Sequence, residues 1–252
     1  MSADMNGKAI SIQLDQRYKE GPIFTIMSYL VTLIVVVIPF GFFMRFLNRV
    51  KIIGKEHLDR ARLPFLFISN HVTMLDDMFI GPLIFVPRGF FNFNFMPYHT
   101  PEQKNFYLGP IVSWVMEHLK CIPLTRGEGI NQPGITSIIE KLKSGSSVQI
   151  YPEGTRTRSG KLGRGKPGVG KIVYETHCQV VPCYHSGLEK VLPIGSKIPR
   201  PFKEVTIIIG EPIKFDRFFH QQNNIETWRE IAEAMVDSIR QLREWGKRQG
   251  WI

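Results

Sequence analysis

The chain has 252 residues, of which 43% are hydrophobic and 21% charged; this excludes a disordered chain and suits one domain with an appendage or two small domains. Its formal net charge of +10 points to an anionic partner: a nucleic acid, an anionic membrane or a phosphorylated substrate. Three cysteines exclude a disulfide scaffold, and a mean hydropathy of −0.07 excludes a polytopic membrane protein but not a single anchor.

The first predicted element is a membrane anchor over residues 21–49, which follows a polar segment, residues 1–20. The run from Gly21 to Met44 carries no charge, and about 20 apolar residues are enough to cross a bilayer. A buried core helix seldom carries so long an uncharged run. Pro39 interrupts the run and leaves two forms open, a kinked span or a helical hairpin that enters one leaflet. Positive charge follows the run from Arg45 onward, which predicts that the rest of the chain lies on the cytoplasmic face.

Residues 50–252 are predicted to form one α/β domain. Short apolar runs predict strands at residues 65–68, 148–151, 179–181 and 205–209. Helical spacing predicts one helix over residues 135–143 and another over residues 225–245, with Asn224 as the N-cap of the second. Thr100 and Gln103 have the spacing of a capping box, with Pro101 at the first helical position, so a further helix is expected to begin there.

The positive charge is concentrated in a glycine-rich window, residues 154–174. The window has no acidic residue, six glycines and six cationic residues, which are Arg156, Arg158, Lys161, Arg164, Lys166 and Lys171. Glycines let backbone N–H groups approach an anion, and cationic side chains neutralise it. The window therefore predicts a phosphate site. A solvated basic loop is the alternative, and the scarcity of stacking aromatic residues disfavours nucleic acid.

Two common phosphate motifs match this window by letter but not by context. Residues 163–168 satisfy G-x-G-x-x-G, but they do not directly follow a predicted strand, as a dinucleotide fold requires. Residues 160–166 satisfy G-x-x-x-x-G-K, but Pro167 stands where a P-loop needs Ser or Thr to hold magnesium. Both interpretations are rejected.

A candidate general base, His71, follows the first strand of the α/β domain, and Asp76 comes five residues later. On one straight helix, residues five apart point about 140° away from each other. The two side chains therefore meet only if His71 lies in the turn before a helix and Asp76 lies in its first turns. Asp76 then holds one ring nitrogen and leaves the other free to take a proton. A purely structural hydrogen bond is the alternative.

Neither a covalent nucleophile nor a metal site is predicted. The chain has no G-x-S-x-G sequence, so an acyl-serine mechanism has no support. Two cysteines and two histidines gather between His177 and His185, but they lack the close spacing of zinc ligands. They also fall on a predicted strand, where successive side chains point to opposite faces. The cysteines are expected to pack as small hydrophobic residues.

Four ordered blocks resemble those of the glycerolipid acyltransferases, a family that includes the lysophosphatidic acid acyltransferases. The blocks are Asn70-His71-x-x-x-x-Asp76, Ile122-Pro-Leu-Thr-Arg126, Tyr151-Pro-Glu153-Gly154-Thr155-Arg156 and Val181-Pro182, and Lys166-Pro-Gly168 resembles a segment after the third block. Four blocks in order over residues 50–215 are far more specific than any one of them. The resemblance implies a single α/β acyltransferase domain with a mixed sheet.

The resemblance also implies roles for these residues. In the family, the first-block histidine deprotonates a glycerol hydroxyl, which attacks an acyl thioester without a covalent enzyme intermediate; here His71 is that base and Asp76 orients it. Residues of the second and third blocks hold the glycerol phosphate, here Arg126, Glu153, Gly154, Thr155 and Arg156, together with Lys166. Since Glu153 cannot itself attract phosphate, it is expected to position the loop or neighbouring cations. No metal or bound cofactor is implied, and acyl-CoA or acyl-carrier protein is a co-substrate.

The expected activity is transfer of a fatty acyl group to the sn-2 hydroxyl of 1-acyl-glycerol-3-phosphate, giving phosphatidic acid, at a phospholipid membrane and without nucleic acid. The doubled Asp76-Asp77 resembles the tafazzins, so phospholipid–lysophospholipid transacylation, with a lysophospholipid acceptor, is the first alternative. A non-catalytic lipid-phosphate binding module is the second. Six phenylalanines between Phe79 and Phe95 fit an acyl-chain groove and ordinary core packing equally well.

Overall fold

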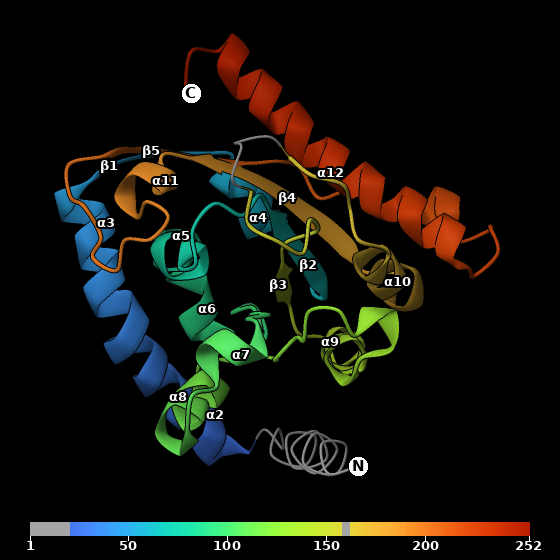
Figure 1. Ribbon diagram of the computed structural model, residues 1–252, viewed down its shortest axis with the longest axis horizontal. Helices are drawn as coiled ribbons and strands as arrows, with labels where there is room; N and C mark the ends of the chain where they lie inside the picture. The colour runs from blue at the N-terminus through green and yellow to red at the C-terminus, as the bar shows by residue number, and fades with distance from the viewer. Residues whose placement is uncertain (1–20, 158–161) are drawn as a thin grey trace.

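Five strands form one mixed sheet at the centre of a computed structural model, which describes residues 21–157 and 162–252 (Figure 1). The strands lie in the order β1-β5-β4-β2-β3, and all neighbours are parallel except β4 and β5. Their bounds are Arg49–Ile53 (β1), Phe65–Ser69 (β2), Val148–Ile150 (β3), Gln179–Ser186 (β4) and Glu204–Ile209 (β5). The mixed α/β sheet expected from the sequence is confirmed.

Helices cover both faces of the sheet. In chain order they are α2 (Pro22–Thr32), the π-helical η1 (Leu33–Gly41), α3 (Phe42–Leu47), α4 (Lys55–Arg60), α5 (Asp76–Ile84), α6 (Arg88–Phe91), α7 (Gln103–Phe106), α8 (Pro110–His118), the 3₁₀ turn η2 (Gly129–Asn131), α9 (Pro133–Lys143), α10 (Pro167–Thr176), α11 (Leu188–Val191), the 3₁₀ turn η3 (Asp216–Phe218) and α12 (Ile225–Arg248).

Strand β2 shows why the central strands are apolar throughout. Phe65 and Phe67 point into a core cluster shared with α3, α4, α5 and α11. Leu66 and Ile68 point the other way, into a cluster shared with α9, α10 and α12. Because successive side chains on a strand face opposite sides, a strand covered on both faces is buried at every position. All five residues of β2 are buried accordingly.

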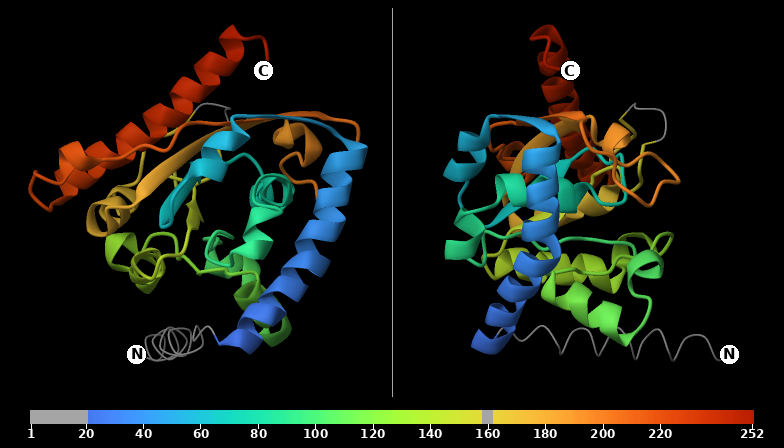
Figure 2. Two further views of the ribbon diagram at one scale, coloured as in Figure 1. Left: turned by 180° about the vertical axis from the view of Figure 1, so that it is seen from behind. Right: turned by 90° about the vertical axis from the view of Figure 1, so that its left-hand side faces the viewer.

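The N-terminal apolar segment is one continuous helix, α2-η1-α3, which runs along one side of the domain (Figure 2). It spans Pro22–Leu47 and is long and apolar enough to cross a membrane by length and composition. The chain does not reverse at Pro39; instead the proline lies inside the π-helical η1, a wider turn that accommodates its missing N–H. The helical hairpin expected as one form of this segment is therefore wrong.

Most predicted elements are confirmed, and the exceptions are short. The four predicted strands correspond to β2, β3, β4 and β5, and Asn224 caps α12 by accepting a hydrogen bond from the backbone N–H of Thr227. The capping box at Thr100 is wrong, because α7 begins only at Gln103 and the Thr100 hydroxyl donates to the carbonyl of Gln149. Strand β1 was not predicted, because it is short and its charges Arg49 and Lys51 continue the positive segment that follows the apolar run.

Close packing, rather than an anion, accounts for two glycines of the basic window. A Cβ atom added at Gly170 would lie 1.8 Å from the carbonyl oxygen of Trp228, and one at Gly165 would lie 2.5 Å from the backbone of Ala232. Both contacts join the window to α12, so these positions exclude any side chain. The expectation that the glycines mark an anion site is therefore wrong for these two residues.

Candidate active site

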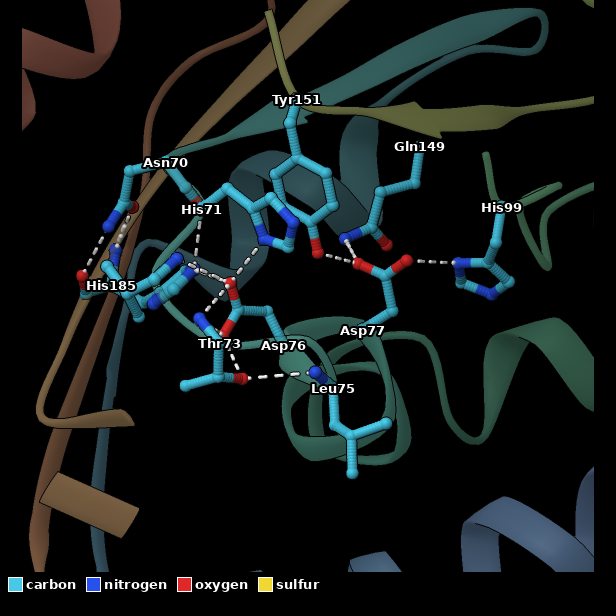
Figure 3. A network of polar contacts seen from close by, with 11 residues as sticks. Asn70, His71, Thr73, Leu75, Asp76, Asp77, His99, Gln149, Tyr151 and His185 are labelled. Carbon is cyan, nitrogen blue, oxygen red and sulfur yellow. Dashed lines mark hydrogen bonds and ion pairs between the residues drawn. The ribbon is translucent and has the colours of Figure 1, made fainter. Parts of the chain in front are cut away.

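The end of β2 places His71 directly before α5, and Asp76 is the first residue of that helix. The Nδ1 atom of His71 lies 2.8 Å from Oδ2 of Asp76 (Figure 3). This is the arrangement that the five-residue spacing requires, with the histidine in the turn and the acid in the first helical turn. The hydrogen bond to Nδ1 leaves Nε2 of His71 as the nitrogen available to a substrate.

Asp76 is fully enclosed and accepts hydrogen bonds from several donors in its own turn. These are the backbone N–H groups of Val72 at 2.8 Å and Thr73 at 2.9 Å, and the hydroxyl of Thr73 at 2.6 Å. Burial alone raises the pKa of a carboxyl group, but here the nearby imidazole of His185 and the hydrogen bonds from His71 and Thr73 outweigh it, and the pKa of Asp76 is lowered. The acid is therefore ionised and fixed before any substrate binds.

A second buried histidine, His185 on β4, supports this turn from behind. The side chain of Asn70 joins the backbone of His185 by two hydrogen bonds of 2.9 Å, and Nε2 of His185 donates to the carbonyl of Asn70 at 2.8 Å. Burial lowers the pKa of His185, although the charge of Asp76 acts against that shift. The side chain is accordingly neutral at pH 7, and the turn that carries His71 is clamped to the neighbouring strand.

A second histidine–acid pair lies next to the first. Asp77 accepts hydrogen bonds from the Tyr151 hydroxyl and from Nε2 of Gln149, and its Oδ2 is 3.1 Å from Nδ1 of His99. The Tyr151 ring also stacks on the imidazole of His71, with 3.9 Å between ring centroids and 14° between planes (Figure 3). The sequence analysis assigned no role to these contacts; the doubled Asp76-Asp77 beside a tyrosine that opens the third block was the available signal.

A cavity of about 660 Å³ opens in front of His71. One part of its wall is polar and contains Arg126, Gly154, Thr155, Arg156 and Lys166. The wall also reaches the N-terminal helix and contains apolar residues, with Thr32, Val36, Val37, Met78, Phe85 and Met116 among its members. Six of the eight predicted site residues thus line one cavity, while Asp76 and Glu153 lie behind its wall.

Glu153 organises the basic loop instead of facing the cavity. It is buried, and its Oε2 accepts a hydrogen bond of 2.7 Å from the backbone N–H of Gly163. Burial raises the pKa of its carboxyl group, and the hydrogen bond from Gly163 partly offsets that shift. The carboxylate holds the loop in place and does not reach the space where a phosphate would lie.

The basic window contributes fewer cations to the cavity than its charge suggested. Of its four described cations, Arg156 and Lys166 line the cavity. Arg164 is exposed outside the cavity, and Nζ of Lys171 forms an ion pair of 3.8 Å with Oε1 of Glu175 on α10. Arg158 and Lys161 lie outside the described residues. Arg126 joins the cavity from a distant part of the sequence, and Glu102 orients it through an ion pair of 2.8 Å.

The aromatic segment between Phe79 and Phe95 belongs mainly to the core. Phe79, Phe85 and Phe95 are buried in the cluster beneath α5, and of the six phenylalanines only Phe85 also lines the cavity. Phe91 is 88% exposed. Core packing therefore describes most of the segment better than an acyl-chain groove does, and the apolar wall is supplied by the helices named above.

Comparisons with known proteins agree with this geometry. The family model described as Acyltransferase matches residues 49–186. The chain is 31% identical to a chloroplastic 1-acyl-sn-glycerol-3-phosphate acyltransferase of Arabidopsis thaliana, over 66% of this chain and 44% of that protein. It is 30% identical to a taffazin of Dictyostelium discoideum, over 66% of this chain and 59% of that protein. The chain thus spans about half the length of the curated relatives it matches.

A solved structure supports the fold. The crystal structure of the 1-acyl-sn-glycerophosphate (LPA) acyltransferase PlsC from Thermotoga maritima superposes with a TM-score of 0.57 at 20% sequence identity. The superposition covers 86% of this chain and 95% of that one. At this identity the likeness establishes a shared fold and leaves the chemistry to the residues of the cavity.

Proposed function

Since the chain belongs to the acyltransferase family, we propose that it transfers a fatty acyl group from acyl-CoA or acyl-carrier protein to the sn-2 hydroxyl of 1-acyl-glycerol-3-phosphate. One observation carries the proposal: His71, held by Asp76 at 2.8 Å, lines a cavity whose wall contains both cations and apolar residues. That combination suits a substrate with a phosphate at one end and an acyl chain at the other.

The proposed chemistry needs one base and no enzyme nucleophile. The Nε2 atom of His71 takes the proton of the acceptor hydroxyl while the hydroxyl oxygen bonds to the thioester carbonyl carbon. The carbon–sulfur bond then breaks, and the departing thiolate takes the proton from His71. Asp76 stabilises the imidazolium that exists between these two transfers and keeps the proton on Nδ1 throughout.

The cationic wall is proposed to hold the acceptor phosphate. Arg126 and Arg156 are able to donate paired hydrogen bonds to phosphate oxygens, and Lys166 adds a positive charge. Gly154 adopts a left-handed conformation at φ +66° directly before Thr155, which exposes the turn to the cavity. Binding at this end places the sn-2 hydroxyl toward His71.

Phospholipid–lysophospholipid transacylation is the second candidate, and the similarity to the Dictyostelium discoideum taffazin favours it. The same base would serve, but the donor would be an oxygen ester and the leaving group a lysophospholipid. The two activities therefore differ in the donor and not in the role of His71.

A substrate panel on the full chain tests both candidates. Lysophosphatidic acid and zwitterionic lysophospholipids are each supplied as acceptor, with acyl-CoA, acyl-carrier protein or a phospholipid as donor. Turnover that requires a thioester and prefers lysophosphatidic acid supports the first proposal, whereas turnover with phospholipid alone supports transacylation. Lipid binding without turnover for every donor would contradict both and favour a non-catalytic lipid-phosphate binding module.

We further propose that the N-terminal helix docks the enzyme on a phospholipid membrane along its side. Its exposed apolar residues form one stripe at intervals of three and four: Ile23, Ile26, Leu30, Ile34, Ile38, Phe42 and Phe46. The opposite side packs on the domain along the whole helix, from the Phe24–His118 ring contact to the buried Met44. A helix that packs on the domain along one side and exposes apolar residues along the other suits one leaflet better than a span.

Two neighbouring segments extend the same face (Figure 2). The start of α8 exposes Ile111 and Trp114, and the loop before β5 exposes Ile198 and Phe202 beside Lys197. That loop is joined to the end of α3, because the backbone N–H of Phe202 donates to the carbonyl of Leu47.

Cosedimentation with anionic vesicles tests the docking proposal. It should be weakened by Ile34→Asp and kept by the matched Ile34→Leu; equal binding of the two variants would contradict the proposal.

A further inference from the structure

A single tyrosine connects the two histidine–acid pairs. The ring of Tyr151 lies flat on the imidazole of His71, and its hydroxyl is bound to Asp77 (Figure 3). Asp77 is itself held by Gln149 at 2.5 Å and by His99 at 3.1 Å. The stack on His71 is therefore tied through Asp77 to the first turn of α5 and to the segment that carries His99.

We infer that Tyr151, tethered by Asp77, is a positioning residue for His71. This inference rests on the proposed function and deepens it. The hydrogen bond that Nδ1–H of His71 donates to Asp76 fixes Nδ1 but leaves the ring free to tilt about that bond. A ring stacked at 3.9 Å and 14° fixes the plane of the imidazole. The two constraints together set the direction of Nε2, the atom that receives the proton.

The sheet register supplies the geometry. Strand β3 pairs with β2 so that Ile150 lies opposite Ile68, and the residues that follow, Tyr151 and His71, leave the same edge of the sheet. Gln149 and Tyr151 are two residues apart and therefore share a face, which lets both reach one carboxylate oxygen of Asp77. Burial, and then the nearby charge of Asp77, raise the pKa of the Tyr151 phenol, which keeps the hydroxyl protonated as a donor.

The orientation of a general base has a measurable effect on the reaction rate. A base acts only within hydrogen-bond reach of the proton it abstracts, and a displacement of about 1 Å is enough to slow a reaction on the order of 100-fold. Tyr151 acts on His71 and is not required to touch the acceptor phosphate. Its loss should therefore lower kcat and leave KM nearly unchanged, which separates it from the cationic residues of the cavity.

Kinetics of Tyr151→Phe provide the first test, because phenylalanine keeps the ring and removes the tether. We expect kcat to fall about 10-fold with KM within about twofold. The matched control is Tyr174→Phe, which removes a hydroxyl bound to the carbonyl of Gln221 at 2.8 Å on residues that do not line the cavity. The control should match the wild type, and both variants should keep the wild-type melting temperature within a few degrees.

Coupling between the two residues provides a sharper test. Asp77→Ala, which removes the acceptor of the Tyr151 hydroxyl, should lower kcat to a similar extent, and the double variant Tyr151→Phe, Asp77→Ala should be no slower than the slower single variant, since both changes break one tether. If the fold-losses in kcat of the two single variants multiply in the double variant, the two residues act independently and the inference is overturned. A wild-type kcat for Tyr151→Phe would also overturn it.

The signal of His71 itself gives a readout that a merely structural role would not move. The measurement is NMR of protein labelled with ¹³C at Cε1 of histidine. The resonance of His71 is identified as the one that is missing from the spectrum of His71→Ala. It should shift and broaden in Tyr151→Phe and stay unchanged in Tyr174→Phe; an unmoved signal in both would contradict the positioning role. If His71→Ala keeps its turnover, the proposed function fails and the inference with it. If His71→Ala is inactive but Tyr151→Phe is fully active, the proposed function stands and the inference alone fails.

Discussion

His71 and Asp76 are held by hydrogen bonds within one turn of the chain, whereas Arg126, Arg156 and Lys166 reach the same cavity from exposed loops. The first region is buried and its acid has many donors. The second is open to solvent, and its strongest described contact is the ion pair between Arg126 and Glu102. The difference teaches that the proposed base is fixed in advance, while the cations proposed to bind phosphate keep the freedom to move toward a charged head group.

Removing the base should have the largest effect. His71→Ala is expected to lower kcat by a factor on the order of 1,000 or more, because the group proposed to take the hydroxyl proton is then missing. Steady-state turnover with a saturating acceptor measures the change, and an unchanged melting temperature shows that the fold remains. Near-normal turnover would remove His71 from the general-base role.

Removing the charge of Asp76 should affect both catalysis and the fold. Asp76→Asn is expected to lower kcat about 100-fold, because the amide no longer fixes the Nδ1–H tautomer of His71. It should also lower the free energy of unfolding by about 2 kcal/mol, since the backbone N–H groups of Val72 and Thr73 lose a charged acceptor. Activity assays and urea denaturation measure the two effects.

A surface carboxylate provides the control for this variant. Asp237→Asn changes an exposed ion pair with Arg240 on α12 and should shift the free energy of unfolding by less than about 0.5 kcal/mol. If the two variants were equally stable, the first turn of α5 would not be the prearranged region described here.

Changes in the cationic loop should act on binding and leave the chemical step alone. Arg156→Ala is expected to raise KM for a phosphorylated acceptor about 10-fold with little change in kcat, which corresponds to about 1.4 kcal/mol of binding free energy. Arg164→Ala is the matched control, because it removes the same charge from the same window outside the cavity. An equal rise in KM for both variants would indicate a general charge effect and would remove Arg156 from the phosphate site.

Acidification should produce the smallest effect, and it comes from His185. Burial lowers its pKa below the ordinary value of 6.5, with Asp76, His71 and Glu189 nearby, so below pH 6.5 the unfolded chain binds a proton that the folded protein does not. The free energy of unfolding should therefore fall as the pH is lowered from 7.5 to 5.5. Asp76, whose pKa is also lowered, adds its own loss only as the pH falls below its ordinary value of 3.8.

The variant His185→Gln checks this assignment, because glutamine is able to keep a donor toward the carbonyl of Asn70 but does not titrate. Urea denaturation across the same pH range should give a flatter profile for the variant than for the wild type. An unchanged slope would show that other groups control the acid response.

Sequence patterns predicted the parts of the molecule that depend on local order. The apolar runs located four of the five strands, and the spacing of His71 and Asp76 required the turn-before-helix geometry that the structure has. The second histidine–acid pair escaped prediction, because His99, Asp77 and Tyr151 meet only through the pairing of β2 with β3 and the position of α5.

The basic window shows why composition alone overstated the phosphate site. Two of its glycines are required by the contact with α12, and two of its four described cations lie outside the cavity. Meanwhile Arg126 enters from another part of the chain. Side chains that are neighbours in sequence need not be neighbours in space, and here the packing of the loop separates them.

If the N-terminal helix docks on a membrane as proposed, it lies between the lipid and the substrate cavity. Thr32, Val36 and Val37 form part of the cavity wall, while Ile34 and Ile38 of the same turns face outward. A helix is about 10 Å across, so substrate and bilayer would press on opposite sides of one element. Lateral pressure and lipid packing would then act directly on the shape of the cavity, and cutting off the helix would remove part of the cavity wall along with the proposed membrane contact.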